Sequence, residues 1–222
     1  MSFAFKFIFI VFAVISTFIQ TEENPKRKFY SPAITAISAA AILVGGLTGS
    51  APPRISLILF AALLMLAMSD MLFELSLEKP NLFALAMVFG VLSGFTIAIL
   101  FNVTAHAAGA PLWVLGIFAV VGIGLLSVVY SFLDVDPGLK IPVYIYLIQA
   151  VFLFTGGMSS LYVGNIFFAI WGVFIFISDS LVGIRAFPNA KKPIPWLDKR
   201  RLLLYILVLY YPAQFALISW AQ

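Results

Sequence analysis

Long uninterrupted apolar runs dominate this sequence, and they constrain its fold more than any other feature. The runs have the length that an α-helix needs, about 20 residues, to cross a hydrocarbon core of about 30 Å. A membrane-spanning strand would instead alternate apolar and polar residues over about ten positions. Hydrophobic residues make up 63% of the chain and charged residues only 10%, whereas soluble domains carry about 25% charged residues. We therefore expect an all-α integral membrane protein.

Clusters of Pro, Gly, Asn and charged residues separate the runs and predict about eight spans in a single transmembrane domain, residues 1–222. Seven spans is the alternative, because the break between the sixth and seventh, around Tyr162–Asn165, is the weakest. The first run lacks a basic leading segment and a small-residue cleavage site, so we expect it to be a retained span. The expected spans are residues 3–20, 32–50, 54–74, 80–102, 110–133, 141–161, 163–185 and 202–221.

Positive charge is distributed unevenly between the loops, with eleven Lys and Arg residues in odd-numbered loops and two elsewhere. The positive-inside rule then places both termini outside the cytoplasm, and we expect a bacterial inner (plasma) membrane. We attribute the net charge of +4 to topology rather than to nucleic-acid binding. The basic loop Ala186–Arg201 serves as a topology anchor or attracts anionic lipid. The eleven are Lys26, Arg27, Lys28, Lys79, Lys140, Arg185, Lys191, Lys192, Lys199, Arg200 and Arg201, and the two are Lys6 and Arg54.

Two short segments resemble each other and suggest an internal repeat. The third span ends in Ser69-Asp70-Met71-Leu72, and the seventh ends in Ser178-Asp179-Ser180-Leu181. Each aspartate lies about 16 residues into its span, or about 24 Å along the helix. Two parallel four-helix repeats, related by an axis along the membrane normal, would produce this pattern.

Ionisable and amide side chains inside apolar spans mark candidate sites, because they are costly in lipid. Asp70 and Glu74 lie one turn apart on one helix face, although Glu74 also fits a solvated helix end. The other polar groups in the spans are Gln149 in the sixth, and Tyr210, Tyr211 and Gln214 in the last. These groups either line a shared cavity with Asp70 and Asp179 or connect helices by hydrogen bonds.

The composition gives little support to a metal site or to thiol chemistry. The chain has no cysteine and one histidine, His106, so it offers no thiolate ligand and no histidine-built site. We expect His106 in a short loop near the non-cytoplasmic surface, distant in depth from the aspartates. The sequence thus predicts no metal and no cofactor.

Taken together, these motifs resemble the lysoplasmalogenase (YhhN-like) family of multi-pass membrane proteins. The resemblance covers eight spans in order, with the aspartate motif ending the third, Phe176-Ile177-Ser178-Asp179 ending the seventh, and Tyr210-Tyr211-Pro212-Ala213-Gln214 in the last. Members cleave the vinyl ether bond of lysoplasmalogens, which gives a fatty aldehyde and a glycerophospho-ethanolamine or -choline.

The resemblance implies roles for individual residues. Asp70 and Asp179 match the paired acidic residues of the family, and Tyr211 with Gln214 match its last-span motif. We expect these aspartates to be catalytic and a lysophospholipid to be the substrate. The residues expected to bind that substrate are Glu74, Gln149, Ser178, Tyr210, Tyr211 and Gln214.

This chain departs from the family pattern in its third and fourth spans. The family commonly carries a His followed three residues later by a Tyr in span four, where Gly94 and Ile97 stand here. Ser69 also replaces a common glycine in the first motif. If the missing histidine orients substrate or moves protons, the substrate or the rate of this protein differs from that of the family.

Two aspartates are sufficient for vinyl ether hydrolysis on chemical grounds. One carboxyl protonates the β-carbon, and water captures the resulting oxocarbenium with help from the other carboxylate. Two close carboxyl groups in a medium of low dielectric constant do not both ionise easily, which favours one acid and one base. The sequence does not assign the two roles.

Two other readings fit the same residues. The aspartates of an ion-coupled or lipid carrier would bind a proton or cation at a repeat interface. A non-catalytic lipid-binding relative would explain the missing histidine. Aldehyde release favours the enzyme, whereas accumulation of lipid or ion in sealed vesicles favours the carrier.

Overall fold

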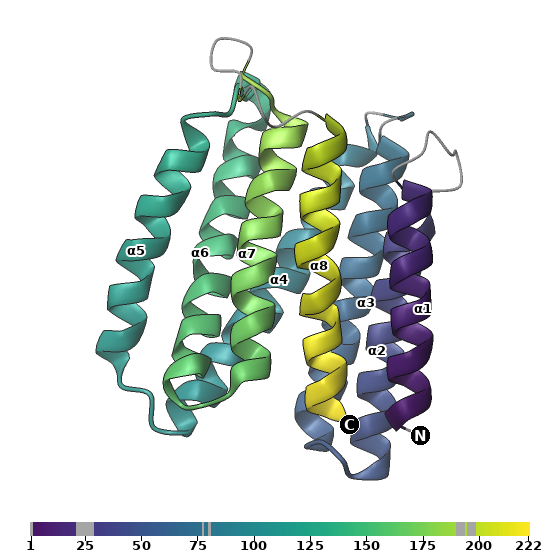
Figure 1. The fold of residues 1–222 in the computed structure, drawn as a ribbon. Coiled ribbons are helices and arrows are strands. Elements are labelled where there is room, and N and C mark those ends of the chain that lie inside the picture. The colour runs from purple at the N-terminus through teal and green to yellow at the C-terminus, as the bar shows by residue number, and fades with distance from the viewer. Residues whose placement is uncertain (1, 21–28, 77, 80, 190–193, 195–198) are drawn as a thin grey trace. The chain divides into compact units, whose positions relative to one another are not determined.

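Among the residues that it describes, the computed structural model has eight α-helices (Figure 1). It describes all residues except 1, 21–28, 77, 80, 190–193 and 195–198. The helices are α1 (Ser2–Gln20), α2 (Tyr30–Thr48), α3 (Pro53–Ser76), α4 (Leu82–Ala107), α5 (Leu112–Tyr130), α6 (Lys140–Tyr162), α7 (Ile166–Ala186) and α8 (Lys199–Ala221). The described residues form one isolated β-bridge and no strand. The expected all-α fold is confirmed.

Seven of the described helices, α2 to α8, are long and apolar enough to cross a membrane. In the remaining helix, α1, the apolar segment whose side chains are described is Phe3–Phe18. This segment is shorter than the seven candidate spans. The protein is therefore a multi-pass membrane protein, and an eighth crossing by α1 stays a prediction.

Helix ends agree with the turn chemistry of the sequence. Asn165 caps the start of α7 by accepting the backbone N–H of Phe168 at 3.2 Å, which defines the break between α6 and α7. The end of α2 is capped by Gly49, whose φ of +79° suits glycine.

One boundary prediction was wrong. The fourth span was expected to end at 102 with His106 in a loop, but α4 continues to Ala107 and holds His106 in its last turn. The polar side chain of Asn102 does not end the helix, because its amide donates to the carbonyls of Ala98 and Phe152. Gly109, with φ of +103°, ends the turn that follows.

The chain divides into two compact units, and each is described separately. The first unit comprises Met1–Ile97 and Ala213–Gln222. In it α2 packs between α1 and α3 (Figure 1), and the end of α8 lies against α2, where Gln222 Nε2 donates to the Ala41 carbonyl at 2.9 Å. A side chain at Gly45 would collide with the Ala221 carbonyl.

The second unit comprises Ala98–Pro212. Its centre is the α6–α7 pair, in which Gly157 and Gly172 bring the two backbones into contact. Phe101 stacks on Phe168 with ring centroids 4.1 Å apart. At one end of this unit, the N–H of Asp134 donates to the Phe187 carbonyl, beside the β-bridge between Leu133 and Pro188.

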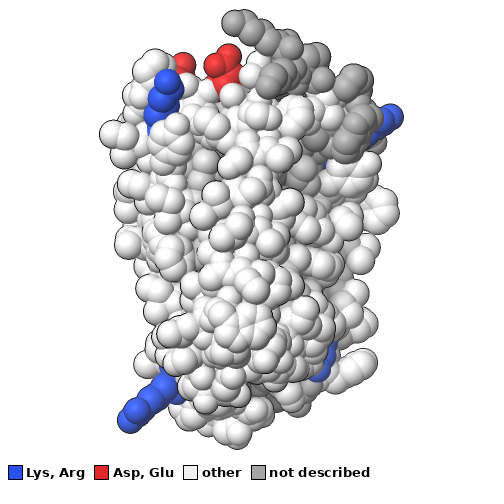
Figure 2. Space-filling model, turned by 90° about the vertical axis from the view of Figure 1, so that its left-hand side faces the viewer, with Lys and Arg blue, Asp and Glu red and all other residues white. Residues whose placement is uncertain are grey.

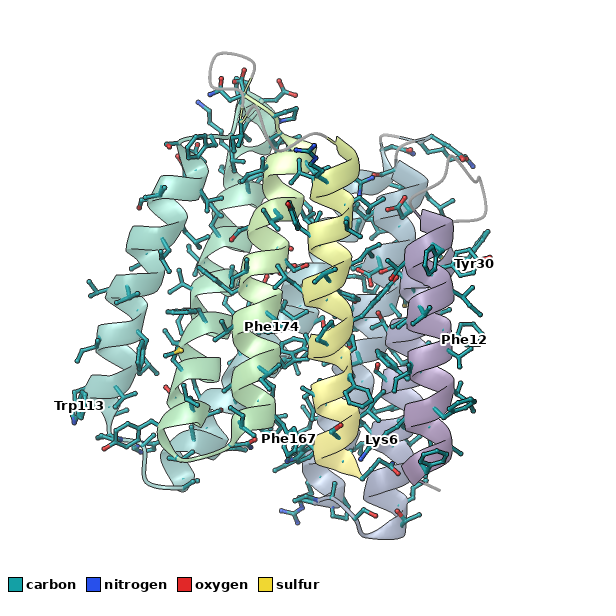
Figure 3. The ribbon with its side chains drawn as sticks, in the orientation of Figure 1. Lys6, Phe12, Tyr30, Trp113, Phe167 and Phe174 are labelled. Carbon is teal, nitrogen blue, oxygen red and sulfur yellow. The ribbon has the colours of Figure 1, made fainter. Side chains whose placement is uncertain are left out.

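Apolar side chains cover the outward face of α5. Leu112, Val120 and Val128 are each at least 60% exposed. On the face shown in Figure 2, the charged atoms of the described residues lie towards the two ends. Aromatic pairs mark both ends of α5 and α6: Trp113 with Tyr162, and Tyr130 with Tyr144. Trp113 points outward at its end of α5 (Figure 3). This pattern is typical of lipid contact between two aromatic interface belts.

Candidate functional site

Asp70, the first of the two aspartates, lies well inside a bilayer-length helix. It precedes the end of α3, at Ser76, by six residues, which corresponds to about 9 Å along the axis. The residue is half-buried. The fully buried hydroxyl of Thr35, in α2, lies 3.2 Å from Asp70 Oδ2. A cross-helix hydrogen bond therefore holds this carboxyl.

Serine hydroxyls set the rotation of α3 against α4. Ser69 donates to the Ala86 carbonyl at 2.8 Å, and Ser93 donates to the Ala62 carbonyl at 2.7 Å. Ser69 thus faces α4, and the next residue, Asp70, contacts α2 through Thr35. Ser69, which departs from the family's common glycine, has a structural contact here.

The remaining candidates of the first unit differ in burial. Glu74 lies in the last turn of α3 and is half-buried, a position that fits either a site residue or a solvated helix end. Gln214, in α8, is fully buried, and neither its amide oxygen nor its amide nitrogen has a hydrogen-bond partner among the described residues. Such a group carries a desolvation cost of about 1–3 kcal/mol.

The second aspartate occupies a similar position in its own helix. Asp179 precedes the end of α7, at Ala186, by seven residues, or about 10 Å, and it is half-buried. The expected distance of about 16 residues into each span is close for Asp70, which follows the start of α3 at Pro53 by 17 residues. It is too long for Asp179, which follows the start of α7 at Ile166 by 13 residues, because α7 begins after the Asn165 cap.

Ser178 and the tyrosines belong to the α7 and α8 part of the second unit. The buried Ser178 hydroxyl lies 3.5 Å from the Ile206 carbonyl, a weak hydrogen bond between α7 and α8. Tyr210 and Tyr211 follow Ile206 by about one turn of α8, and both are buried. Gln149, in α6, is also buried, and its amide oxygen lacks a partner within the described part of the chain.

The predicted shared cavity combines residues of both units and stays a prediction. Asp70, Glu74 and Gln214 belong to the first unit. The members in the second unit are Gln149, Ser178, Asp179, Tyr210 and Tyr211. The sequence analysis did not identify Thr35, which contacts Asp70 within the first unit. A signal was present, because Ser31, Thr35 and Ser38 place three hydroxyl side chains on one side of α2.

The two positions in α4 that depart from the family pattern are apolar and buried. Gly94 and Ile97 both lie in α4, and Ile97 has no exposed surface. Neither offers a group that transfers a proton. Any proton transfer must therefore depend on other residues.

Comparisons with known proteins leave the family open. No family model matches this chain, and neither a curated protein nor a solved structure matches it.

Proposed function

We propose that this protein is an intramembrane lipid hydrolase that cleaves the vinyl ether bond of lysoplasmalogens. The products are a fatty aldehyde and glycerophospho-ethanolamine or glycerophospho-choline. The proposal rests on the resemblance of the aspartate and last-span motifs to the lysoplasmalogenase family. The structural observation that supports it is the position of Asp70, a half-buried residue whose carboxyl is held by Thr35 two turns inside an apolar helix.

The depth of this carboxyl suits the bond to be cleaved. In a lysoplasmalogen the vinyl ether joins the glycerol to the chain, so it lies just below the headgroup. A carboxyl about 9 Å from the helix end is at the depth of that bond when the headgroup stays at the interface. Asp179, about 10 Å from its own helix end, suits the same depth.

The chemistry needs one proton donor and one proton acceptor. A protonated aspartate gives its proton to the β-carbon of the vinyl ether, which leaves an oxocarbenium at the α-carbon. Water adds to that carbon as the other aspartate accepts a proton from it. The resulting hemiacetal then collapses to the aldehyde and the glycerol hydroxyl. Asp70 and Asp179 supply the two carboxyl groups in this proposal.

The buried polar groups of α6, α7 and α8 are proposed to bind the lipid. Gln214 carries amide hydrogen-bonding capacity that no described residue satisfies, and this suits an ether or glycerol oxygen. Gln149, Ser178, Tyr210 and Tyr211 complete the proposed substrate contacts, with Glu74 nearer to the headgroup.

The proposed orientation follows from the charge distribution. Both termini face away from the cytoplasm, and the ends of α3 and α7 that are nearer to the aspartates face it. The protein would then act on lysophospholipid in the cytoplasmic leaflet of a bacterial plasma membrane. Of the basic residues behind this proposal, Lys26, Arg27, Lys28, Lys191 and Lys192 lie outside the described residues.

The test is aldehyde release from choline and ethanolamine lysoplasmalogens by the purified protein, detected by mass. Asp70→Asn and Asp179→Asn should each lower the rate by about 10²–10⁴-fold, because asparagine neither donates an acid proton nor accepts one. The double variant should lose little more, since the pair acts as a unit. Glu74→Gln, in the same helix, should be milder if Glu74 is a solvated helix end rather than a substrate contact.

Two results would contradict the proposal. Full activity in both single aspartate variants would remove the acid–base pair. Accumulation of lipid in sealed vesicles without aldehyde would indicate a carrier instead, and binding with neither activity would indicate a lipid-binding protein.

A further inference from the structure

The Thr35 hydroxyl lies near one acceptor in α3 and another in its own helix. Its Oγ1 lies 3.2 Å from Asp70 Oδ2 and 3.1 Å from the carbonyl oxygen of Ser31, one turn earlier in α2. Thr35 has no exposed surface. A hydroxyl carries one hydrogen and can accept through its lone pairs. It therefore donates to one of these oxygens at a time.

The two arrangements correspond to the two protonation states of Asp70. When the carboxylate is ionised, the Thr35 hydroxyl donates to Oδ2. When the carboxyl is protonated, its O–H donates to Thr35 Oγ1, and the hydroxyl hydrogen turns towards the Ser31 carbonyl. The heavy atoms keep their places in both arrangements, because only the hydroxyl rotates.

We propose that Thr35 is the positioning residue that holds the Asp70 carboxyl in both of its protonation states. A catalytic aspartate alternates between these states in each turnover, and a fixed partner that suits only one state would release it in the other. As a statement about catalysis the inference rests on the proposed hydrolase activity. As a statement about the Thr35–Asp70 pair it can be tested without that activity.

If Thr35 only stabilised its own helix, the variants would behave differently. Threonine hydroxyls in helices often bond to the carbonyl one turn back, as Ser38 does to Ile34 in the same helix at 3.1 Å. Ser38 is equally buried, so Ser38→Ala removes a buried α2 hydroxyl that is bonded within its own helix. It is the matched control for Thr35→Val, which keeps the side-chain shape but removes the hydroxyl.

The kinetic experiment compares Thr35→Val, Thr35→Ser and Ser38→Ala. We expect Thr35→Val to lower kcat by up to about 100-fold, because it loosens the reacting carboxyl, with KM little changed. Thr35→Ser restores the hydroxyl and should recover most of the rate, and Ser38→Ala should behave as wild type. Wild-type kcat in Thr35→Val would overturn the inference, as would an equal loss in Ser38→Ala.

An infrared experiment on the same variants does not require activity. The Asp70 bands are assigned by their loss in Asp70→Asn, in a pH titration that follows both the carboxyl band and the carboxylate band. Thr35→Val should shift both bands, whereas Thr35→Ser and Ser38→Ala should not. An unshifted band in either state overturns the inference. If wild-type protein releases no aldehyde, the hydrolase proposal fails, and the infrared shifts still decide whether Thr35 holds Asp70.

Discussion

The contact between α6 and α7 gives the sharpest stability prediction. A Cβ added at Gly172 would lie 2.7 Å from the Gly157 Cα and 2.9 Å from the Leu153 carbonyl oxygen. Both obstacles are backbone atoms, so no side-chain rotation relieves the overlap. Packing between helices in a membrane depends on such close approach of small residues.

Gly172→Ala should therefore force the two helices apart. Carbon atoms make favourable contact at about 3.5–4.0 Å, so the backbones must separate by roughly 1 Å. Overpacking of this kind costs about 1–3 kcal/mol. Since 1.4 kcal/mol is a factor of ten, the ratio of folded to unfolded protein should fall about 5- to 140-fold.

The assay is thermal unfolding of the purified protein in lipid nanodiscs, followed by tryptophan fluorescence. Gly157→Ala should cost less, because its Cβ would lie 3.1 Å from the Gly172 Cα. The control is Gly116→Ala, since Gly116 lies on the exposed face of α5 with nothing within 4 Å of an added Cβ. Equal melting temperatures for Gly172→Ala and Gly116→Ala would refute the described α6–α7 packing.

Three further predictions concern orientation, lipid exposure and the buried amide. A cysteine at position 222 should be labelled only from the non-cytoplasmic side, as the Lys and Arg distribution requires, and labelling only from the cytoplasm would reverse the topology. Lipids brominated near the headgroup should quench Trp113, which is 59% exposed, and spare Trp171, which is 1% exposed, so Trp113→Phe should remove more quenching than Trp171→Phe. Gln214→Met should raise the melting temperature by removing an unsatisfied amide, worth about 1–3 kcal/mol, while it lowers aldehyde release. A lower melting temperature would show that the amide is satisfied.

The helices could be predicted from the sequence because the information is local. Apolar runs and turn residues give each boundary to within a few positions, as at Gly49 and Asn165. The error at α4 came from a tertiary contact. Asn102 has the chemistry of a loop residue, but Phe152, fifty positions away, accepts its hydrogen bond.

The candidate site was only partly predictable for the same reason. The sequence places Asp70 and Asp179 inside apolar helices, but counting residues along the runs gave the depth of Asp179 less well, because α7 begins at Ile166. Thr35 was missed because its partner is 35 positions away, and a threonine in an apolar helix otherwise indicates a bond to its own backbone.

Hydrogen bonding separates the polar side chains of the spans into two groups that the sequence cannot distinguish. Ser69 and Ser93 donate to carbonyls of the neighbouring helix, so they contribute to packing. Gln214 and the amide oxygen of Gln149 lack partners among the described residues although both side chains are buried. Groups of the second kind cost stability, and real proteins keep such costs mainly at functional sites. The two glutamines are therefore stronger candidates for lipid contact than the two serines. In the sequence alone, all four are simply polar residues within apolar segments.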